Sequence, residues 1–193
     1  MSMSSPKPDK KYTYGDYLKW PDEERWEIID GVPYDMSPAP STKHQTISME
    51  LGRQLANYLL DKDCQAIIAP FDVRIPFDDE PDEEIQTVVQ PDIIVICDRS
   101  RLDERGYRGA PGLLIEILSP STSKKDLQEK YHLYERSGVK EYWVVFPREE
   151  LIEVYQLNKD TKYAKTGTYQ INDRIKPGIL PELEIDVSLV FAS

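Results

Sequence analysis

Three apolar runs constrain the fold of this chain more than any other feature of its sequence. They are VVQPDIIVIC (Val88 to Cys97), LLIEIL (Leu113 to Leu118) and EYWVVF (Glu141 to Phe146). Runs of this length are typical of strands that are buried on both faces of a sheet. Between the second and third runs, the pattern predicts a helix from about Ser123 to Ser137 that ends at Gly138. We therefore expect a mixed α/β chain with a central sheet and helices on its faces.

The rest of the chain adds shorter elements to this sheet. The pattern predicts a short helix from Thr13 to Trp20, a hairpin that turns at Asp30-Gly31, and a helix capped by Ser41 or Thr42 that runs to about Leu60. The alternating stretch FDVRIPF predicts a half-buried strand at 71–77, and tyrosine-rich segments near the C-terminus predict antiparallel strands. Because proline cannot donate to a sheet, we expect a bulge or a strand entry at Pro91-Asp92.

Length and charge limit the possible classes of protein. A chain of 193 residues with 39% hydrophobic and 31% charged residues suits a single globular domain, predicted at 12–193 after a disordered tail at 1–11. The net charge of −11 argues against broad electrostatic affinity for nucleic acid. Part of it comes from the acidic run FDDEPDEE (Phe77 to Glu84), which we interpret as a solvated loop, and a bound divalent cation could compensate part of the remainder.

The sequence also gives expectations about the compartment. We find no apolar span of 18 residues and no apolar segment of the kind found in signal peptides near the N-terminus, so we expect no membrane association. The two cysteines, Cys64 and Cys97, do not make a disulfide scaffold, and Cys97 is expected to be an ordinary core thiol. Together these features favour a cytoplasmic protein.

Two carboxylates lie within the apolar runs. An isolated ionised carboxylate in apolar surroundings is costly, so Asp92 and Glu116 must be paired, bound to a metal or kept neutral. Carboxylate oxygens are the ligands that Mg²⁺ and Mn²⁺ prefer, so two carboxylates on adjacent strands make a metal site or a pair that shares a proton. The alternatives are an Asx-type turn at Asp92 and a buried salt bridge between Glu116 and Lys130.

Several stretches of the chain, taken in order, resemble one protein family. They are RWEIIDG, His44, QPDIIVI, LLIEILSPST and KDLQEKYHLYERSGVKEYWVV. In this order and spacing they resemble the Uma-two family, a large bacterial group of restriction-endonuclease-like proteins in the PD-(D/E)XK nuclease superfamily. The resemblance runs from about Tyr12 to about Phe191. It implies a restriction-endonuclease-like core, in which a central mixed sheet flanked by helices carries Asp92 and Glu116 on neighbouring strands.

The resemblance also implies a metal site. Asp92 matches the aspartate of the PD motif and Glu116 matches the glutamate of the following strand, which in this superfamily hold a divalent metal ion, here Mg²⁺ or Mn²⁺. Glu27 and His44 match further family positions. Glu27 is implied as a third metal ligand and a catalytic residue; the alternative is an exposed cross-strand partner. His44 is implied as an assisting catalytic residue; the alternative is a core histidine whose hydrogen bonds are satisfied within the fold.

The catalytic lysine departs from the usual pattern of the superfamily. That lysine commonly lies two residues after the glutamate, where this chain has Leu118. In the family that this chain resembles, the lysine is moved to the following helix, which makes Lys130 the candidate. Lys124 and Lys125 are rival lysines in the preceding turn, and a pair with Asp126 on the helix surface is the alternative role for Lys130.

The resemblance implies a metal-dependent endonuclease or phosphodiesterase that acts on DNA, with metal-activated water as the nucleophile. Two other classes stay open. One is an interaction module that keeps the nuclease fold with weak or no catalysis, which the acidic composition and Leu118 favour. The other is a hydrolase of a smaller phosphorylated substrate, which would tolerate a negative surface better than duplex DNA does.

A homodimer is also expected, on the basis of the tyrosines near the C-terminus. Tyr155, Tyr163 and Tyr169 are amphipathic aromatic residues of the type enriched at protein interfaces. The alternative is that they belong to an ordinary face of the antiparallel strands.

Overall fold

The computed structural model describes residues 10–21, 24–36, 39–119 and 125–192, so most of the expected tail at 1–11 lies outside the described residues. The chain forms two compact units, each built on a sheet of its own. Unit 1 comprises Met1–Ala39, Phe71–Gln90 and Ser100–Gly109, and unit 2 comprises Pro40–Pro70, Pro91–Arg99 and Ala110–Ser193. The predicted mixed sheet with flanking helices is confirmed in unit 2, and unit 1 adds a second mixed sheet.

Unit 1 contains a six-stranded sheet in the order β2-β1-β5-β4-β8-β7. The elements are α1 (Tyr14–Tyr17), β1 (Trp26–Ile29), β2 (Val32–Asp35), β4 (Val73–Arg74), η1 (Asp82–Glu84), β5 (Val88–Val89), β7 (Leu102–Asp103) and β8 (Gly106–Arg108). The predicted hairpin is confirmed: Asp30 and Gly31 both have positive φ, 51° and 77°, as a two-residue hairpin turn requires. The strand expected at 71–77 is only two residues long, and the segment at 98–111 contributes β7 and β8.

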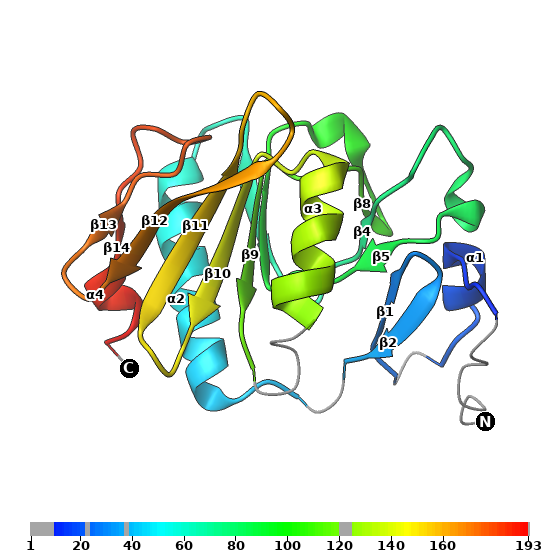
Figure 1. Ribbon diagram of the computed structural model, residues 1–193, viewed down its shortest axis with the longest axis horizontal. Helices are drawn as coiled ribbons and strands as arrows, with labels where there is room; N and C mark the ends of the chain where they lie inside the picture. The colour runs from blue at the N-terminus through cyan, green and yellow to red at the C-terminus, as the bar shows by residue number, and fades with distance from the viewer. Residues whose placement is uncertain (1–9, 22–23, 37–38, 120–124, 193) are drawn as a thin grey trace. The chain divides into compact units, whose positions relative to one another are not determined.

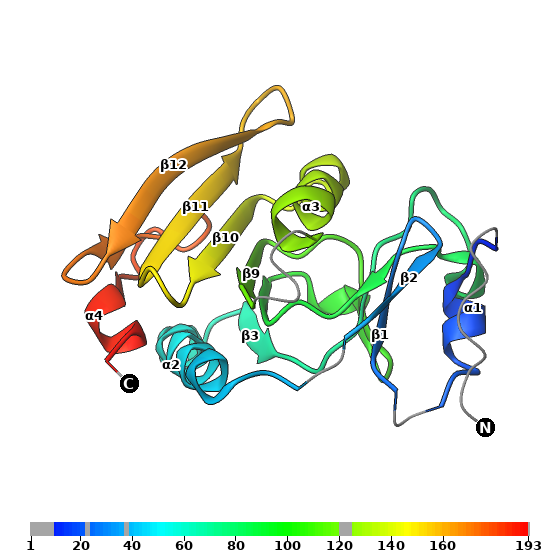
Figure 2. The same ribbon diagram turned by 60° about the horizontal axis from the view of Figure 1, so that its bottom comes forward.

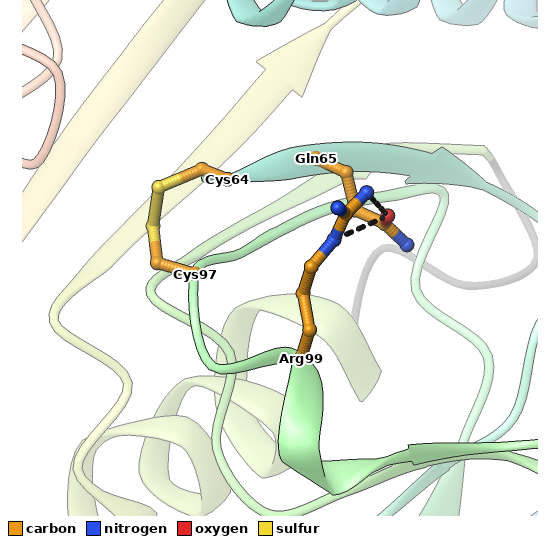
Figure 3. The surroundings of a disulfide bond; sticks show 4 residues. All are labelled: Cys64, Gln65, Cys97 and Arg99. Carbon is orange, nitrogen blue, oxygen red and sulfur yellow. Dashed lines mark hydrogen bonds between the residues drawn. A yellow bond between two sulfur atoms is a disulfide. The ribbon is translucent and has the colours of Figure 1, made fainter. Parts of the chain in front are cut away.

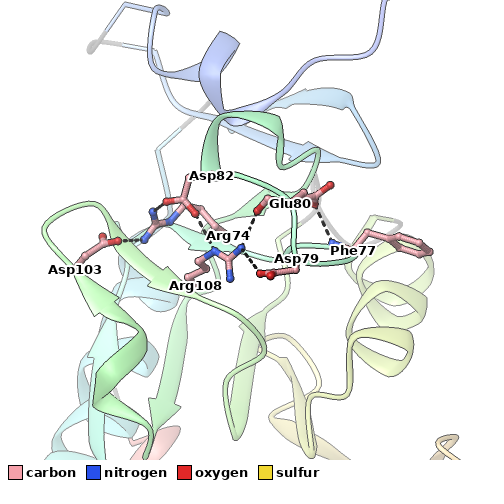
Figure 4. A network of polar contacts seen from close by, with 7 residues as sticks. All are labelled: Arg74, Phe77, Asp79, Glu80, Asp82, Asp103 and Arg108. Atoms are coloured by element: carbon pink, nitrogen blue, oxygen red, sulfur yellow. Dashed lines mark hydrogen bonds and ion pairs between the residues drawn. The ribbon is translucent and has the colours of Figure 1, made fainter.

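A buried cation explains why the strand at 71–77 does not have a solvent-exposed face. Arg74 is fully buried and forms ion pairs with Asp82 and, at 2.6 Å, with Asp103 (Figure 4). Arg108 donates to Asp82 at 2.9 Å and to the carbonyl oxygen of Glu80 at 2.8 Å. The acidic run at 77–84 is therefore not simply a solvated loop, because Asp82 joins two arginines. Phe77, at the start of this run, is 89% exposed.

Unit 2 contains a six-stranded sheet in the order β12-β11-β10-β9-β6-β3, in which only β9 and β10 are parallel. Its elements are α2 (Thr42–Leu59), β3 (Gln65–Ile68), β6 (Ile93–Ile96), β9 (Leu113–Ile117), η3 (Lys125–Lys130), α3 (Tyr131–Ser137), β10 (Glu141–Phe146), β11 (Leu151–Leu157), β12 (Tyr163–Gln170), β13 (Arg174–Ile175), β14 (Ile185–Asp186) and α4 (Val187–Val190), and η2 (Arg99–Arg101) begins at its boundary with unit 1. Figures 1 and 2 show α2 on one face of the sheet and α3 on the other.

The main apolar core lies between α2 and the sheet of unit 2. An apolar stripe along α2 packs in one cluster with alternate residues of β6, β9 and β10; it consists of Ile47, Leu51, Leu55 and Leu59. Ser41 caps α2 by accepting a hydrogen bond from the backbone N–H of His44 at 3.3 Å. These features follow from the 3.6-residue period of the helix and from the alternation of the strands.

The first apolar run is divided between the two sheets. Val88–Val89 pairs within the sheet of unit 1, whereas Ile93–Ile96 pairs with β3 and β9 in unit 2. The interruption falls at Gln90 to Asp92. Of the two expected forms, a bulge or a strand entry, the structure shows the entry, because β6 begins directly after Asp92. The helix expected at 123–137 begins as a π-helical turn, η3, and continues as α3 to Ser137, where Gly138 adopts the left-handed conformation at φ 81°.

The expectation of a core thiol at Cys97 is wrong. Cys97 is exposed and forms a disulfide with Cys64 (Figure 3). Gln65 pairs with Ile96 in the antiparallel β3–β6 ladder, so Cys64 and Cys97 occupy the next pair of facing positions. Beside the disulfide, Arg99 donates two hydrogen bonds to the side-chain oxygen of Gln65. Among the described residues, no helix is both long and apolar enough to cross a bilayer.

Candidate active site

Asp92 lies at the point where the chain enters β6. Its Oδ2 atom accepts a hydrogen bond from the backbone N–H of Ile117 at 2.7 Å, and its Oδ1 atom lies 3.2 Å from Nε2 of His44. The carbonyl oxygen of Asp92 accepts from the N–H of Ala69 at 2.9 Å. Because the side chain accepts a hydrogen bond from the last residue of β9, its carboxylate is fixed at the end of two adjacent strands. The Asp92 side chain is 18% exposed.

His44 is placed by the first turn of α2. The backbone of this turn is fixed by the Ser41 cap, and the imidazole is almost fully buried. For Nε2 to donate to Asp92, the proton must be on Nε2, which leaves Nδ1 as an acceptor in the neutral ring. Nδ1 is buried and has no hydrogen-bond partner in the part of the chain that the structure describes. His44 therefore has one nitrogen occupied by Asp92 and one that could accept a proton.

Glu116 is paired with a lysine inside unit 2. Its Oε1 atom accepts from Nζ of Lys130 at 2.8 Å and from the hydroxyl of Tyr134 at 2.8 Å. Glu116 is 3% exposed and Lys130 is 2% exposed. Lys130 is the last residue of the π-helical turn η3, a rare conformation that is frequent at functional sites. The ion pair with Lys130 and the hydrogen bond from Tyr134 allow the Glu116 carboxylate to be buried in an apolar strand, because they compensate its charge and its lost hydration.

The sheet brings the two carboxylates to the same end of neighbouring strands. In the antiparallel β6–β9 ladder Ile93 faces Ile115, so the same register carried one residue further sets Asp92 opposite Glu116. Ile115 and Ile117 point into the core beneath α2, and Glu116 between them points to the other face, where it meets Lys130 and Tyr134. The two pairs, Asp92 with His44 and Glu116 with Lys130, both belong to unit 2.

Glu27 belongs to unit 1. It is fully buried in β1 and accepts a hydrogen bond from the backbone N–H of Gln90 at 2.8 Å. An exposed cross-strand role for Glu27 is therefore wrong. Gln90 also donates from its side chain to Asp72 at 2.9 Å, where burial raises the pKa of the Asp72 carboxyl. Membership of Glu27 in a metal site stays a prediction, although its partner Gln90 precedes Asp92 by only two residues in the chain.

The carboxylates Asp92 and Glu116 can supply some of the ligands that a divalent metal ion needs. Within the described ranges, no three His, Cys, Asp or Glu side chains are grouped so that they could hold a metal ion. Mg²⁺ is commonly held by one or two carboxylates, with water and substrate phosphate completing its six ligands. Asp92 and Glu116 can supply two such carboxylates, so the residues fit a metal of this type. Lys124 and the side chains of Lys125 and Asp126 lie outside the described part of the structure.

Sequence patterns did not single out Tyr134 as a site residue. Its hydroxyl shares the Oε1 atom of Glu116 with Lys130. The available signal was its spacing, because residues four apart on a helix lie on one face, and Tyr134 follows Lys130 by four. A polar group on a fully buried tyrosine also needs a hydrogen-bond partner.

The chain has a restriction-endonuclease-like fold, with acidic residues at the ends of adjacent strands. A solved structure supports the fold: a crystal structure described as a "putative nuclease belonging to DUF820" from Anabaena variabilis has a TM-score of 0.74 and 22% identity, and the match covers 93% of this chain and 97% of that one.

The family follows from the sequence comparisons. The model of the Uma2 family, described as "Putative restriction endonuclease", matches residues 14–188, and the chain belongs to this family. "Uncharacterized protein slr1290" from Synechocystis is 30% identical over 178 residues, which cover 91% of this chain and 88% of that protein. The family expected from the sequence is therefore confirmed.

Proposed function

We propose that this protein is a Mg²⁺- or Mn²⁺-dependent nuclease that hydrolyses phosphodiester bonds in DNA. The observation that carries the proposal is the hydrogen bond from the N–H of Ile117 to Asp92, which fixes the Asp92 carboxylate beside the strand position of Glu116. Membership of the Uma2 family supports the same reaction class. When bound, the metal ion would activate water and offset the charge on the scissile phosphate.

The residues of the site have separate roles in this proposal. Asp92 and Glu116 would hold the metal ion. Lys130 neutralises Glu116 in the unbound protein and would stabilise the nucleophile near it, since an ammonium favours negative charge. His44 orients Asp92 through Nε2 and could accept a proton at Nδ1.

The negative charge of the chain is distributed unevenly between the two units, which weakens the argument that its net charge disfavours DNA binding. Unit 1 contains 17 of the 35 acidic residues but only nine of the 24 basic ones, so unit 2 has 18 acidic against 15 basic residues. Most of the net negative charge therefore lies outside the unit that carries Asp92 and Glu116. This weakens the argument against a polyanionic substrate, which rested on the charge of the whole chain.

Cleavage of supercoiled plasmid tests the proposal. Wild type is incubated with Mg²⁺, Mn²⁺ or chelator, and nicked product is quantified beside Asp92→Ala and the matched variant Asp63→Ala, an exposed aspartate of unit 2. We expect metal-dependent nicking that Asp92→Ala loses and Asp63→Ala keeps. Nicking that survives Asp92→Ala would point to a contaminating nuclease, and no nicking by wild type with either metal would remove the proposal.

One observation favours a second function. Glu116 and Lys130 satisfy each other inside the fold, so the pair can persist without a metal ion, as an interaction module would require. In that case neither metal would shift the melting temperature of wild type. A ligand at 100 times its dissociation constant stabilises a protein by roughly 2.7 kcal/mol, so a thermal melt with and without Mn²⁺ separates the two functions.

The predicted homodimer and cytoplasmic location are further parts of the proposal. The structure removes one argument for the dimer, because Tyr163 is buried and its hydroxyl donates to the carbonyl oxygen of Val139 at 2.9 Å. Tyr155 packs against Tyr131 and Tyr163 within unit 2. Light scattering at micromolar concentration tests the dimer, and a monomer mass would exclude it at that concentration.

A further inference from the structure

One oxygen of Glu116 receives two hydrogen bonds from one helical segment. Nζ of Lys130 and the hydroxyl of Tyr134 both donate to Oε1 at 2.8 Å. The two donors lie four residues apart, Lys130 at the end of η3 and Tyr134 in α3. A carboxylate with a single donor can rotate about its terminal bond, whereas two donors on the same oxygen define its orientation.

The two donors differ in stiffness. A lysine reaches its partner through a flexible stem of four carbons, so the ammonium alone fixes a position poorly. The tyrosine ring is rigid and fully buried, and it forms a T-shaped pair with Tyr142, with ring centroids 5.3 Å apart and an angle of 70° between the planes. Tyr134 is therefore the donor that can hold Glu116 in one place.

We propose that Tyr134 is a positioning residue, whose hydroxyl orients Glu116 at the metal site. This inference rests on the proposed function, because it assigns the hydroxyl to the metal ligand and not to packing. A phenylalanine would fill the same space, so the oxygen atom is the part of Tyr134 that the role requires. Removing a group that orients a metal ligand typically weakens metal affinity or activity by about 10- to 100-fold.

A buried tyrosine hydroxyl also has a purely structural role, and a matched variant separates the two. Tyr163 is another buried tyrosine of unit 2, and its hydroxyl donates to the carbonyl oxygen of Val139, not to Glu116. Tyr163→Phe therefore removes one buried hydrogen bond of similar length without touching the carboxylate. The two phenylalanine variants are expected to melt at similar temperatures in chelator.

The experiment titrates Mn²⁺ into the full-length chain and follows the melting temperature, with kcat and KM for plasmid nicking as a second measurement. For Tyr134→Phe we expect the Mn²⁺ midpoint to rise by about 10- to 100-fold. We also expect kcat to fall at fixed Mn²⁺, and KM for DNA to stay within about twofold because Tyr134 is fully buried. Tyr163→Phe should keep the wild-type midpoint and kcat.

Two results overturn the inference in distinguishable ways. If Tyr134→Phe and Tyr163→Phe both keep the wild-type Mn²⁺ midpoint, Tyr134 is structural and the proposed nuclease function stands. If wild type shows neither a Mn²⁺ shift nor nicking, the nuclease function fails and the inference falls with it. Should Tyr134→Phe melt too low to titrate, fluorotyrosine at position 134 changes the strength of the hydroxyl donor within the same ring. A changed midpoint for that variant, but not for fluorotyrosine at 163, supports the inference, and equal midpoints overturn it.

Discussion

The two units of this protein are stabilised by different contacts. Unit 2 buries a large apolar cluster that includes Leu51 and Trp143, both fully buried. Unit 1 has strands of two to four residues, and it buries the guanidinium of Arg74 between Asp82 and Asp103. Apolar burial involves no ionisable group, whereas ion pairs need both partners to be present and charged and are weakened by salt.

The difference bears on the candidate site. Replacing a buried ion pair with apolar residues is often neutral or stabilising, so a unit with a large apolar core does not need such a pair to fold. The pair of Glu116 and Lys130 lies in the apolar unit, which favours a functional role for it. Arg74 lies in the unit with the short strands, where we expect its ion pairs to stabilise the fold itself.

Removing the buried cation of unit 1 should give the largest effect. Arg74→Met leaves Asp103 without its cation and Asp82 with Arg108 alone, and breaking a buried pair on one side costs up to about 3–5 kcal/mol. Urea unfolding measures the loss. Arg174→Met is the matched control in unit 2: Arg174 also contacts two carboxylates but is 58% exposed, so a loss below about 1 kcal/mol is expected. Equal losses for both variants would mean that the buried network does not stabilise unit 1.

Core truncation tests the other half of the comparison. Leu51→Ala removes a fully buried side chain of α2 and should cost roughly 2–5 kcal/mol through lost burial and the cavity left behind. Met49→Ala, on the same helix, changes a side chain that is 63% exposed and should cost less than about 0.5 kcal/mol. A small loss at Leu51, measured by urea unfolding, would contradict the view that apolar packing dominates unit 2.

The disulfide adds a covalent constraint to unit 2. Cys64 and Cys97 are separated by 33 residues, and a disulfide that closes a loop of this length is expected to contribute about 2–4 kcal/mol. We expect a reductant to lower the melting temperature of wild type to that of the double variant Cys64→Ser/Cys97→Ser. The double variant should not respond to reductant. If reductant does not change the melting temperature of wild type either, the two cysteines are not joined by a disulfide in solution.

The smallest effect concerns pH and a buried carboxyl in each unit. Burial raises the pKa of Asp72 in unit 1 and of Glu141 in unit 2, so each folded unit favours the neutral form. The folded protein then binds more protons than the unfolded chain between the ordinary and the raised pKa, and stability falls as pH rises through that window. Asp72→Asn keeps an acceptor for Tyr17 and Gln90 and removes the charge.

The stability of Asp72→Asn relative to wild type should therefore increase from about pH 4 upward, as measured by urea unfolding at several pH values. Glu141→Gln should show the same sign in unit 2. A relative stability of Asp72→Asn that does not change with pH would mean that Asp72 titrates alike in the folded and unfolded states.

The sequence predicted those parts of the fold that depend on neighbours in the chain. The hairpin at Asp30-Gly31, the stripe of α2, the stop at Gly138 and the strands β9 and β10 each follow from a local period or a local turn. The family motif also identified Asp92, Glu116 and Lys130 as candidates before any contact was known. The elements were predictable because the positions that specify each of them are close together in the sequence.

Tertiary structure alone decided how distant segments meet. No local pattern showed that 88–97 supplies strands to two sheets, that Arg74 would be buried, or that Cys64 would face Cys97. Tyr134 has the same position on the helix whether its ring only packs on the sheet or its hydroxyl also donates to Glu116. That choice depends on which strand lies beneath α3, and the pairing of β9 between β6 and β10 fixes it through contacts that no single stretch of sequence contains.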